Sequence, residues 1–124
     1  MSHPTIDHWR GIKRILRYFQ GTIQHCLHIK PSTDLDLVGF SDADWATSVD
    51  DRKSMASQCV FLGETLVSWS SRKQKAASRS NTKSEYRALA DLADKIAWTH
   101  SLLDELKLPL PREPTLWCDN LSAK

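Results

Sequence analysis

A single amphipathic stretch near the carboxyl end limits the folds that this chain can adopt. Between residues 83 and 107, apolar side chains recur at the spacing of one helical face, and Pro109 and Pro111 follow. The stripe consists of Leu89, Leu92, Ala93, Ile96, Leu103 and Leu106. A helix of this length buries such a stripe only against another layer of structure. The sequence therefore predicts a long helix packed on a sheet.

The periodicity of the other segments supplies that sheet. It predicts a short helix over residues 7–20 and strands over residues 35–44, 57–62, 65–71 and 115–119. Gly63 and Glu64, between the second and third strands, suit a tight hairpin turn. We expect an α/β fold with a mixed sheet, built from a strand, a hairpin, the long helix and a parallel strand.

Composition places the chain among ordered proteins of the cell interior. Hydrophobic residues make up 40% and charged residues 26%, which are globular values. No apolar run approaches the about 20 residues of a membrane helix, and the first residues lack the apolar core of a signal peptide. The three cysteines do not form close pairs, which favours a reducing compartment. We expect an intracellular location, in the cytoplasm or the nucleus, and no membrane partner.

Charge is distributed in blocks of alternating sign. Residues 1–33 carry a net charge of +4, residues 34–51 carry −6, and residues 52–87 carry +6. Metal-dependent enzymes that act on polyanions have this layout, because carboxylates hold cations while nearby lysines and arginines hold phosphates. Solvated protein surfaces also have such blocks, so the pattern alone does not decide the function.

Three carboxylates stand at the ends of predicted elements. Asp42 lies late in the first strand, Glu85 lies in the first turn of the long helix, and Asp119 ends the last strand. Reactive groups gather at the carboxyl ends of strands in α/β sheets. If the first and last strands are parallel neighbours, these three side chains converge on one site of hard oxygen ligands suited to Mg²⁺.

Each carboxylate also has a structural interpretation. Thr82 precedes Glu85 by three residues, which matches a helix capping box, and Asp119 is placed to cap a following helix. An aspartate at position 42 is costly on an apolar strand unless it binds something. Asp44 shares its face, and the pattern alone does not choose between the two.

A basic link joins the hairpin to the long helix. Arg72, Lys73, Lys75 and Arg79 follow the third strand, and we interpret them as candidates for binding a nucleic-acid backbone. A solvated loop explains them equally well. Trp69 and Trp98 are candidate stacking platforms for bases, although core packing is the more common role of tryptophan.

Several motifs occur in a fixed order along the chain. They are residues 39–46 (GFSDADWA), 50–54 (DDRKS), 59–63 (CVFLG), 67–75 (VSWSSRKQK), 84–90 (SEYRALA) and 117–120 (WCDN). Together they resemble the ribonuclease H domain of copia-type retrotransposon Pol polyproteins. Residues 1–23, with KRILRYFQGT at 13–22, resemble the tail of the reverse transcriptase that precedes that domain. The resemblance spans essentially the whole chain.

This resemblance implies a division of the chain and a set of roles. Residues 1–33 are expected to be the reverse transcriptase tail, and residues 34–124 a ribonuclease H-like domain that is truncated at its C-terminus. The implied activity is hydrolysis of the RNA strand of an RNA–DNA hybrid with two Mg²⁺ ions, or Mn²⁺ in their place. Asp42, Glu85 and Asp119 are then the catalytic, metal-binding carboxylates, which selects Asp42 over Asp44.

The resemblance also sets expectations for partners and activity. The implied partners are the RNA–DNA hybrid and the reverse transcriptase part of the same polyprotein. The family usually carries a fourth acidic residue on a later helix that this sequence does not reach, so we expect weak or no activity from the isolated chain. The alternatives are a non-catalytic nucleic-acid-binding remnant, which the basic stretches favour, and an effector-like interaction protein.

Overall fold

The computed structural model describes residues 3–47 and 50–119 as two helices and four strands. In chain order these are α1 (Ile6–Thr22), β1 (Leu37–Asp44), β2 (Met55–Leu62), β3 (Thr65–Lys73), α2 (Asn81–Glu105) and β4 (Thr115–Cys118). Every predicted element is present, with ends that differ from the predicted ones by a few residues. The predicted mixed α/β architecture is confirmed, and it is consistent with a ribonuclease H-like fold.

The four strands form one mixed sheet in the order β3-β2-β1-β4. β1 and β3 are antiparallel to β2, while β4 is parallel to β1, as the sequence predicts. Gly63 makes the β2–β3 turn with a φ of 57°, and a Cβ atom there would collide with the carbonyl oxygen of Asp34. The hairpin therefore requires glycine at this turn.

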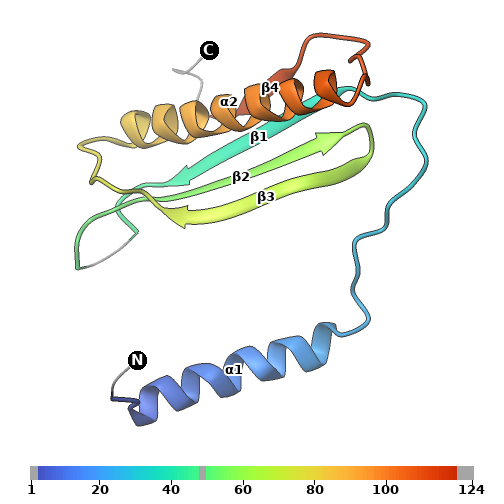
Figure 1. Ribbon diagram of the computed structural model, residues 1–124. Helices are drawn as coiled ribbons and strands as arrows, with labels where there is room; N and C mark the ends of the chain where they lie inside the picture. The colour runs from blue at the N-terminus through green and yellow to red at the C-terminus, as the bar shows by residue number, and fades with distance from the viewer. Residues whose placement is uncertain (1–2, 48–49, 120–124) are drawn as a thin grey trace.

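Helix α2 covers one face of the sheet (Figure 1). Alternate residues of β1, beginning at Leu37, are buried on this face, and Leu37 and Val60 form the core with Leu92 and Ile96 of α2. Gly39 lets the helix approach closely, because a Cβ atom at this position would lie 2.8 Å from Leu92 Cδ1. The position of α2 over β1 is thus fixed by packing.

The ends of α2 differ from the sequence prediction. The N-cap is Ser80, whose hydroxyl accepts a hydrogen bond from the Lys83 backbone N–H, so the predicted capping box from Thr82 to Glu85 is wrong. The helix therefore begins at Asn81, two residues before the predicted start at residue 83. At the other end Lys107 has a φ of 60°, and the Leu108 N–H donates to the Leu103 carbonyl, which ends the helix before the prolines.

The second face of the sheet is open to solvent. Phe40, Cys59, Trp69 and Trp117 lie side by side in one row across all four strands. Trp69 is 65% exposed, and Trp98 on α2 is also exposed, so the expectation that these two tryptophans pack in the core is wrong. Their rings lie on outward-facing positions that neither layer covers.

Helix α1 lies apart from the sheet, at the end of an extended connection (Figure 1). It begins with a capping box between Thr5 and His8, and none of its residues is buried. Its apolar residues, including Trp9, Leu16 and Phe19, are all exposed. None of the helices in the described part of the chain has the length and apolar character needed to cross a membrane.

Candidate metal centre

Two of the three predicted carboxylates are placed by the pairing of β1 with β4. Phe40 pairs with Trp117, and Ser41 pairs with Cys118, in parallel register. Asp42 and Asp119 are the next residues along β1 and after β4, so these neighbouring strands carry them to the same edge of the sheet. Both carboxylates are exposed at this edge.

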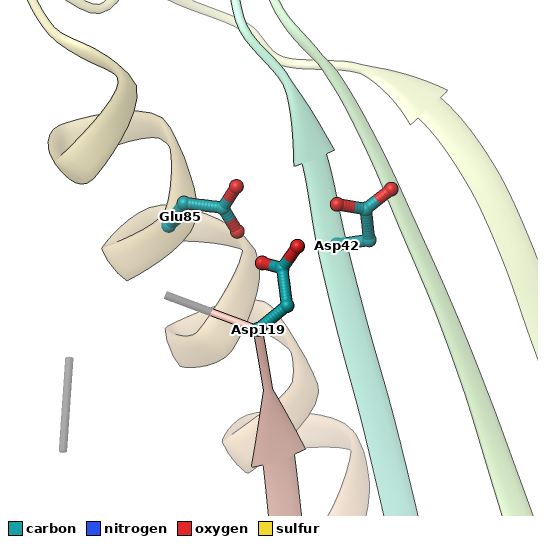
Figure 2. Close-up of side chains that lie close together, drawn as sticks. All are labelled: Asp42, Glu85 and Asp119. Carbon is teal, nitrogen blue, oxygen red and sulfur yellow. The ribbon is translucent and has the colours of Figure 1, made fainter. Parts of the chain in front are cut away.

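Helix α2 supplies the third carboxylate. Glu85 lies in its second turn rather than in the first turn as predicted, and its side chain is almost completely buried, with 3% exposed. One carboxylate oxygen from each of Asp42, Glu85 and Asp119 lies within 4.8 Å of the other two. Figure 2 shows the three side chains pointing toward a common point. Asp44 is not a member of this cluster.

The cluster concentrates negative charge around a buried group. Burial raises the pKa of the Glu85 carboxyl, and the charges of Asp119 and Asp42 raise it further. A hydrogen bond from the Ala43 backbone N–H lowers the pKa, and Asp44 makes a smaller contribution that raises it. The net shift is upward, so Glu85 resists ionisation until something offsets the neighbouring charges.

The residues fit a divalent cation. Glu85 Oε2 is buried and has no hydrogen-bond partner among the described residues, although a buried carboxylate oxygen normally has one. All the donor atoms in the cluster are carboxylate oxygens, the ligands that Mg²⁺ and Mn²⁺ prefer. A bound cation would satisfy Glu85 Oε2 and neutralise the repulsion among the three carboxylates.

Behind the cluster, Gln74 ties the first turn of α2 to the sheet. Its side-chain amide donates to the Ser84 carbonyl at 2.8 Å, next to Glu85, and its Oε1 accepts from the Ser78 hydroxyl at 3.3 Å. Its backbone N–H donates to the Ser54 carbonyl at 2.8 Å. Gln74 is buried, so these bonds are shielded from water and hold the Glu85 backbone in place.

Two more side chains reinforce this junction. The indole N–H of Trp45, which follows β1, donates to the Ser78 carbonyl at 2.9 Å. Arg87 of α2 donates to the Ala76 carbonyl at 2.9 Å and to the Ser78 hydroxyl at 3.0 Å. The connection between β3 and α2 is therefore anchored to both elements that carry Asp42 and Glu85.

The four predicted basic residues lie in two different segments of the structure. Arg72 and Lys73 end β3, whereas Lys75 and Arg79 lie in the connection to α2, and all four are exposed. Arg72, Lys73 and Lys75 line a groove between β3 and α2, but Arg79 is not one of its lining residues. Lys73 also forms an ion pair with Asp51 at 3.3 Å.

Sequence reasoning missed Gln74 and the α2 side of the groove. A lone glutamine within a basic run gives no signal of burial, because its partners come from three different segments. Arg87 and Lys95, which line the groove, do have a signal. They occur with Asp91 at intervals of four residues, which places all three on one face of a helix.

Several relatives of the chain are transposon proteins. It is 45% identical over 123 residues to the retrovirus-related Pol polyprotein from transposon RE2 of Arabidopsis thaliana, covering 99% of this chain and 8% of that protein. The identity to the Pol polyprotein from transposon TNT 1-94 of Nicotiana tabacum is 35% over 123 residues, covering 99% and 9%. The homologues of the chain include copia-type retrotransposon Pol polyproteins, and the similarity extends over the whole chain. The chain spans less than a tenth of the length of these two relatives.

A shorter relative is the secreted RxLR effector protein 161 of Plasmopara viticola. It is 39% identical over 97 residues, which cover 78% of this chain and 68% of that protein. No family model matches the chain. No solved structure matches it either. The relation to Pol polyproteins therefore rests on sequence identity along the whole chain.

Proposed function

We propose that this part of the retrotransposon polyprotein is a ribonuclease H-type nuclease that hydrolyses the RNA strand of RNA–DNA hybrids. The observation that carries the proposal is the convergence of Asp42, Glu85 and Asp119 within 4.8 Å. The Pol relatives support it, because the three residues lie in motifs that resemble the ribonuclease H domain of such polyproteins.

In this proposal the three carboxylates bind the cations. Two Mg²⁺ ions, when bound, supply an activated water molecule and stabilise the leaving 3′ oxygen. Asp42 and Asp119 offer exposed oxygens to ligand and substrate, while Glu85 offers its buried, unpartnered Oε2. The Gln74 contacts keep Glu85 in register with the strand ends, so that the site is formed before the substrate binds.

The experiment is cleavage of a labelled RNA–DNA hybrid by the purified chain in Mg²⁺. We expect weak or no cleavage by the isolated chain, and any cleavage of the RNA strand should stop in EDTA and be lost in Asp42→Asn and in Glu85→Gln. Asp44→Asn is the matched control and is expected to cleave like the wild type, because Asp44 lies outside the cluster. Cleavage of the RNA strand that survives Asp42→Asn, or that continues in EDTA, contradicts the proposal.

A non-catalytic function has one observation in its favour. The basic groove between β3 and α2 supports nucleic-acid binding whether or not the carboxylates work. The name of the Plasmopara viticola relative gives the effector-like alternative a precedent in that protein alone. Salt-sensitive binding without any turnover in the hybrid assay favours the binding remnant over the nuclease.

A further inference from the structure

A groove lies between α2 and β3. Its volume is about 690 Å³. Arg72, Lys73 and Lys75 line it from the β3 side, and Arg87, Asp91 and Lys95 line it from α2. Five basic side chains thus face a single acidic one, which makes the groove strongly cationic.

The sheet register explains why this groove exists. On the covered face, Gly39 and Val60 lie in one row with Ser68, and Ser41 and Gln58 lie in the next row with Ser70. Because α2 packs over β1 at Gly39, only the small serines of β3 stand at the outer edge. At these two rows the side chains of β3 are therefore too short to fill the space beside the helix.

The positive charge in the groove is available for a ligand. Arg87 donates to the Ala76 and Ala77 carbonyls, which are neutral acceptors, so its charge is not cancelled. Neither Arg72 nor Lys75 forms an ion pair with a described residue. Lys73 has Asp51 as a counter-charge. The groove therefore attracts anions more strongly than its surroundings do.

A buried acceptor gives the groove a second chemical feature. Gln58 is one of the lining residues, and its Oε1 is buried without a hydrogen-bond partner in the described part of the chain. Such an acceptor is costly unless a donor reaches it. A ligand that combines phosphates with N–H or O–H donors, as a nucleotide does, satisfies both features.

The groove begins near the candidate metal centre. Ala43, Ala56 and Arg72 lie in one row across β1, β2 and β3. Ala43 follows Asp42, so the backbone at Arg72 lies about 10 Å from that of Ala43, two strand spacings away. From Arg72 the groove follows β3 toward Ser68, which is about 13 Å at the rise of a strand.

We propose that this groove binds a single nucleic-acid strand by its phosphates and carries it away from the three carboxylates. A volume of 690 Å³ suits a segment of roughly two nucleotides and is too small for a double helix. The inference rests on the proposed function for the path of the strand. The binding itself requires no metal and no cleavage, and it is independent of sequence because only phosphates and one acceptor are contacted.

The test is the affinity of the whole chain for a short, labelled single-stranded DNA, measured by fluorescence anisotropy in EDTA at several salt concentrations. The groove variant is Lys75→Glu with Lys95→Glu, and the matched control is Lys13→Glu with Arg14→Glu on α1, which makes the same charge change away from the sheet. We expect the groove variant to bind about tenfold more weakly. Its slope of log affinity against log salt falls by about 1.4, the value for two lost contacts to a single strand.

Equal weakening of the groove variant and the control overturns the inference, because general charge then explains the binding. Tighter binding of a blunt duplex than of the single strand by the wild type also overturns it. Because EDTA removes the metal ions, a chain that cleaves hybrids but whose groove variant binds normally refutes this inference alone. A chain that binds through the groove but whose cleavage survives Asp42→Asn refutes the proposed nuclease mechanism alone.

Chemical footprinting of the wild type avoids any doubt about the folding of variants. Lysines are acetylated with and without the single-stranded DNA and identified by mass spectrometry. We expect the DNA to protect Lys75 and Lys95 while Lys13 and Lys107 react as before. Protection that is equal at all four lysines, or absent from Lys75 and Lys95, contradicts binding in the groove.

Discussion

Glu85 is expected to destabilise the fold when no metal is bound and to favour the fold when a divalent cation is bound. It is buried beside two aspartates, with one oxygen lacking a partner among the described residues, and its pKa is raised mainly by burial. Without a cation this arrangement opposes folding at neutral pH. The same arrangement favours a divalent ion, which replaces the missing partner and cancels the repulsion.

The raised pKa predicts how the stability of the metal-free chain depends on pH. The pKa of the Glu85 carboxyl is higher in the folded protein than in the unfolded chain. Such a group stabilises the fold fully at pH values below its pKa in the unfolded chain. This contribution is lost as the pH rises through its pKa in the folded protein. In EDTA, we expect the wild type to lose stability relative to Glu85→Gln as the pH rises from acid toward neutral. Urea denaturation at a series of pH values measures this, and a difference that is constant with pH contradicts it.

Replacement of Gly39 tests the close packing of α2 on β1. Its Cβ would lie 2.8 Å from Leu92 Cδ1, so Gly39→Ala forces the side chains of α2 to move. We expect a loss of about 1–3 kcal/mol in the free energy of unfolding, the usual cost of overpacking a core. Denaturation of Gly39→Ala, Leu92→Ala and the double variant gives the coupling between the two sites. A double variant whose loss equals the sum of the single losses shows that there is no steric conflict.

The Asp42 motif shows what single residues reveal from sequence. The sequence argument assumed that a charge on this apolar strand would be buried, whereas Asp42 is exposed at the end of the strand. The structure nevertheless places Asp42 in the cluster. The choice against Asp44 came from the resemblance, since both share one strand face. Glu85 was ambiguous because the apparent capping box offered a competing role, which the N-cap at Ser80 removes.

At the scale of elements, the junction between β3 and α2 controls the site. Gln74 bonds to Ser54, Ser78 and Ser84, and so joins the end of β3 to the loop after β1 and to the first turn of α2. Periodicity predicted both flanking elements. It did not predict this junction, because hydrogen bonds between segments distant in sequence leave no periodic pattern.

Replacement of Gln74 tests this role. Gln74→Met keeps a side chain of similar length. It leaves the Ser84 carbonyl and the Ser78 hydroxyl without their buried hydrogen-bond partner. We expect a loss of about 1–3 kcal/mol in the free energy of unfolding, together with weaker Mn²⁺ binding, because the first turn of α2 is released. Gln24→Met, in the exposed connection after α1, is the control and should change neither quantity. Mn²⁺ affinity equal to that of the wild type means that Gln74 does not position Glu85.

At the scale of the whole molecule, the chain consists of a sheet layered with α2 and a separate helix. The mixed sheet follows from strand periodicity, and the order of its strands follows from a short hairpin and a long helical crossover. The open second face was not predictable from periodicity. Phe40 and Trp117 have the alternation of core residues, yet no layer of the described chain covers them.

Matched truncations distinguish the two parts of the molecule. Leu92→Ala removes a fully buried side chain of the core and should cost about 2–5 kcal/mol of unfolding free energy. Leu16→Ala on α1 removes an exposed side chain and should change the unfolding of the sheet by less than about 0.5 kcal/mol. Denaturation followed by tryptophan fluorescence compares them, and a large effect of Leu16→Ala shows that α1 packs on the sheet.

The most direct test of the metal centre is a calorimetric titration of the chain with Mn²⁺. We expect binding by the wild type and by Asp44→Asn, and loss of binding in Asp42→Asn, Glu85→Gln and Asp119→Asn, because only these three carboxylates converge. Binding should also stabilise the fold, by about 1.4 kcal/mol when the free metal is ten times its Kd. Binding that persists in all three cluster variants, or that depends on Asp44 as strongly as on Asp42, would show that the carboxylates do not form a metal centre.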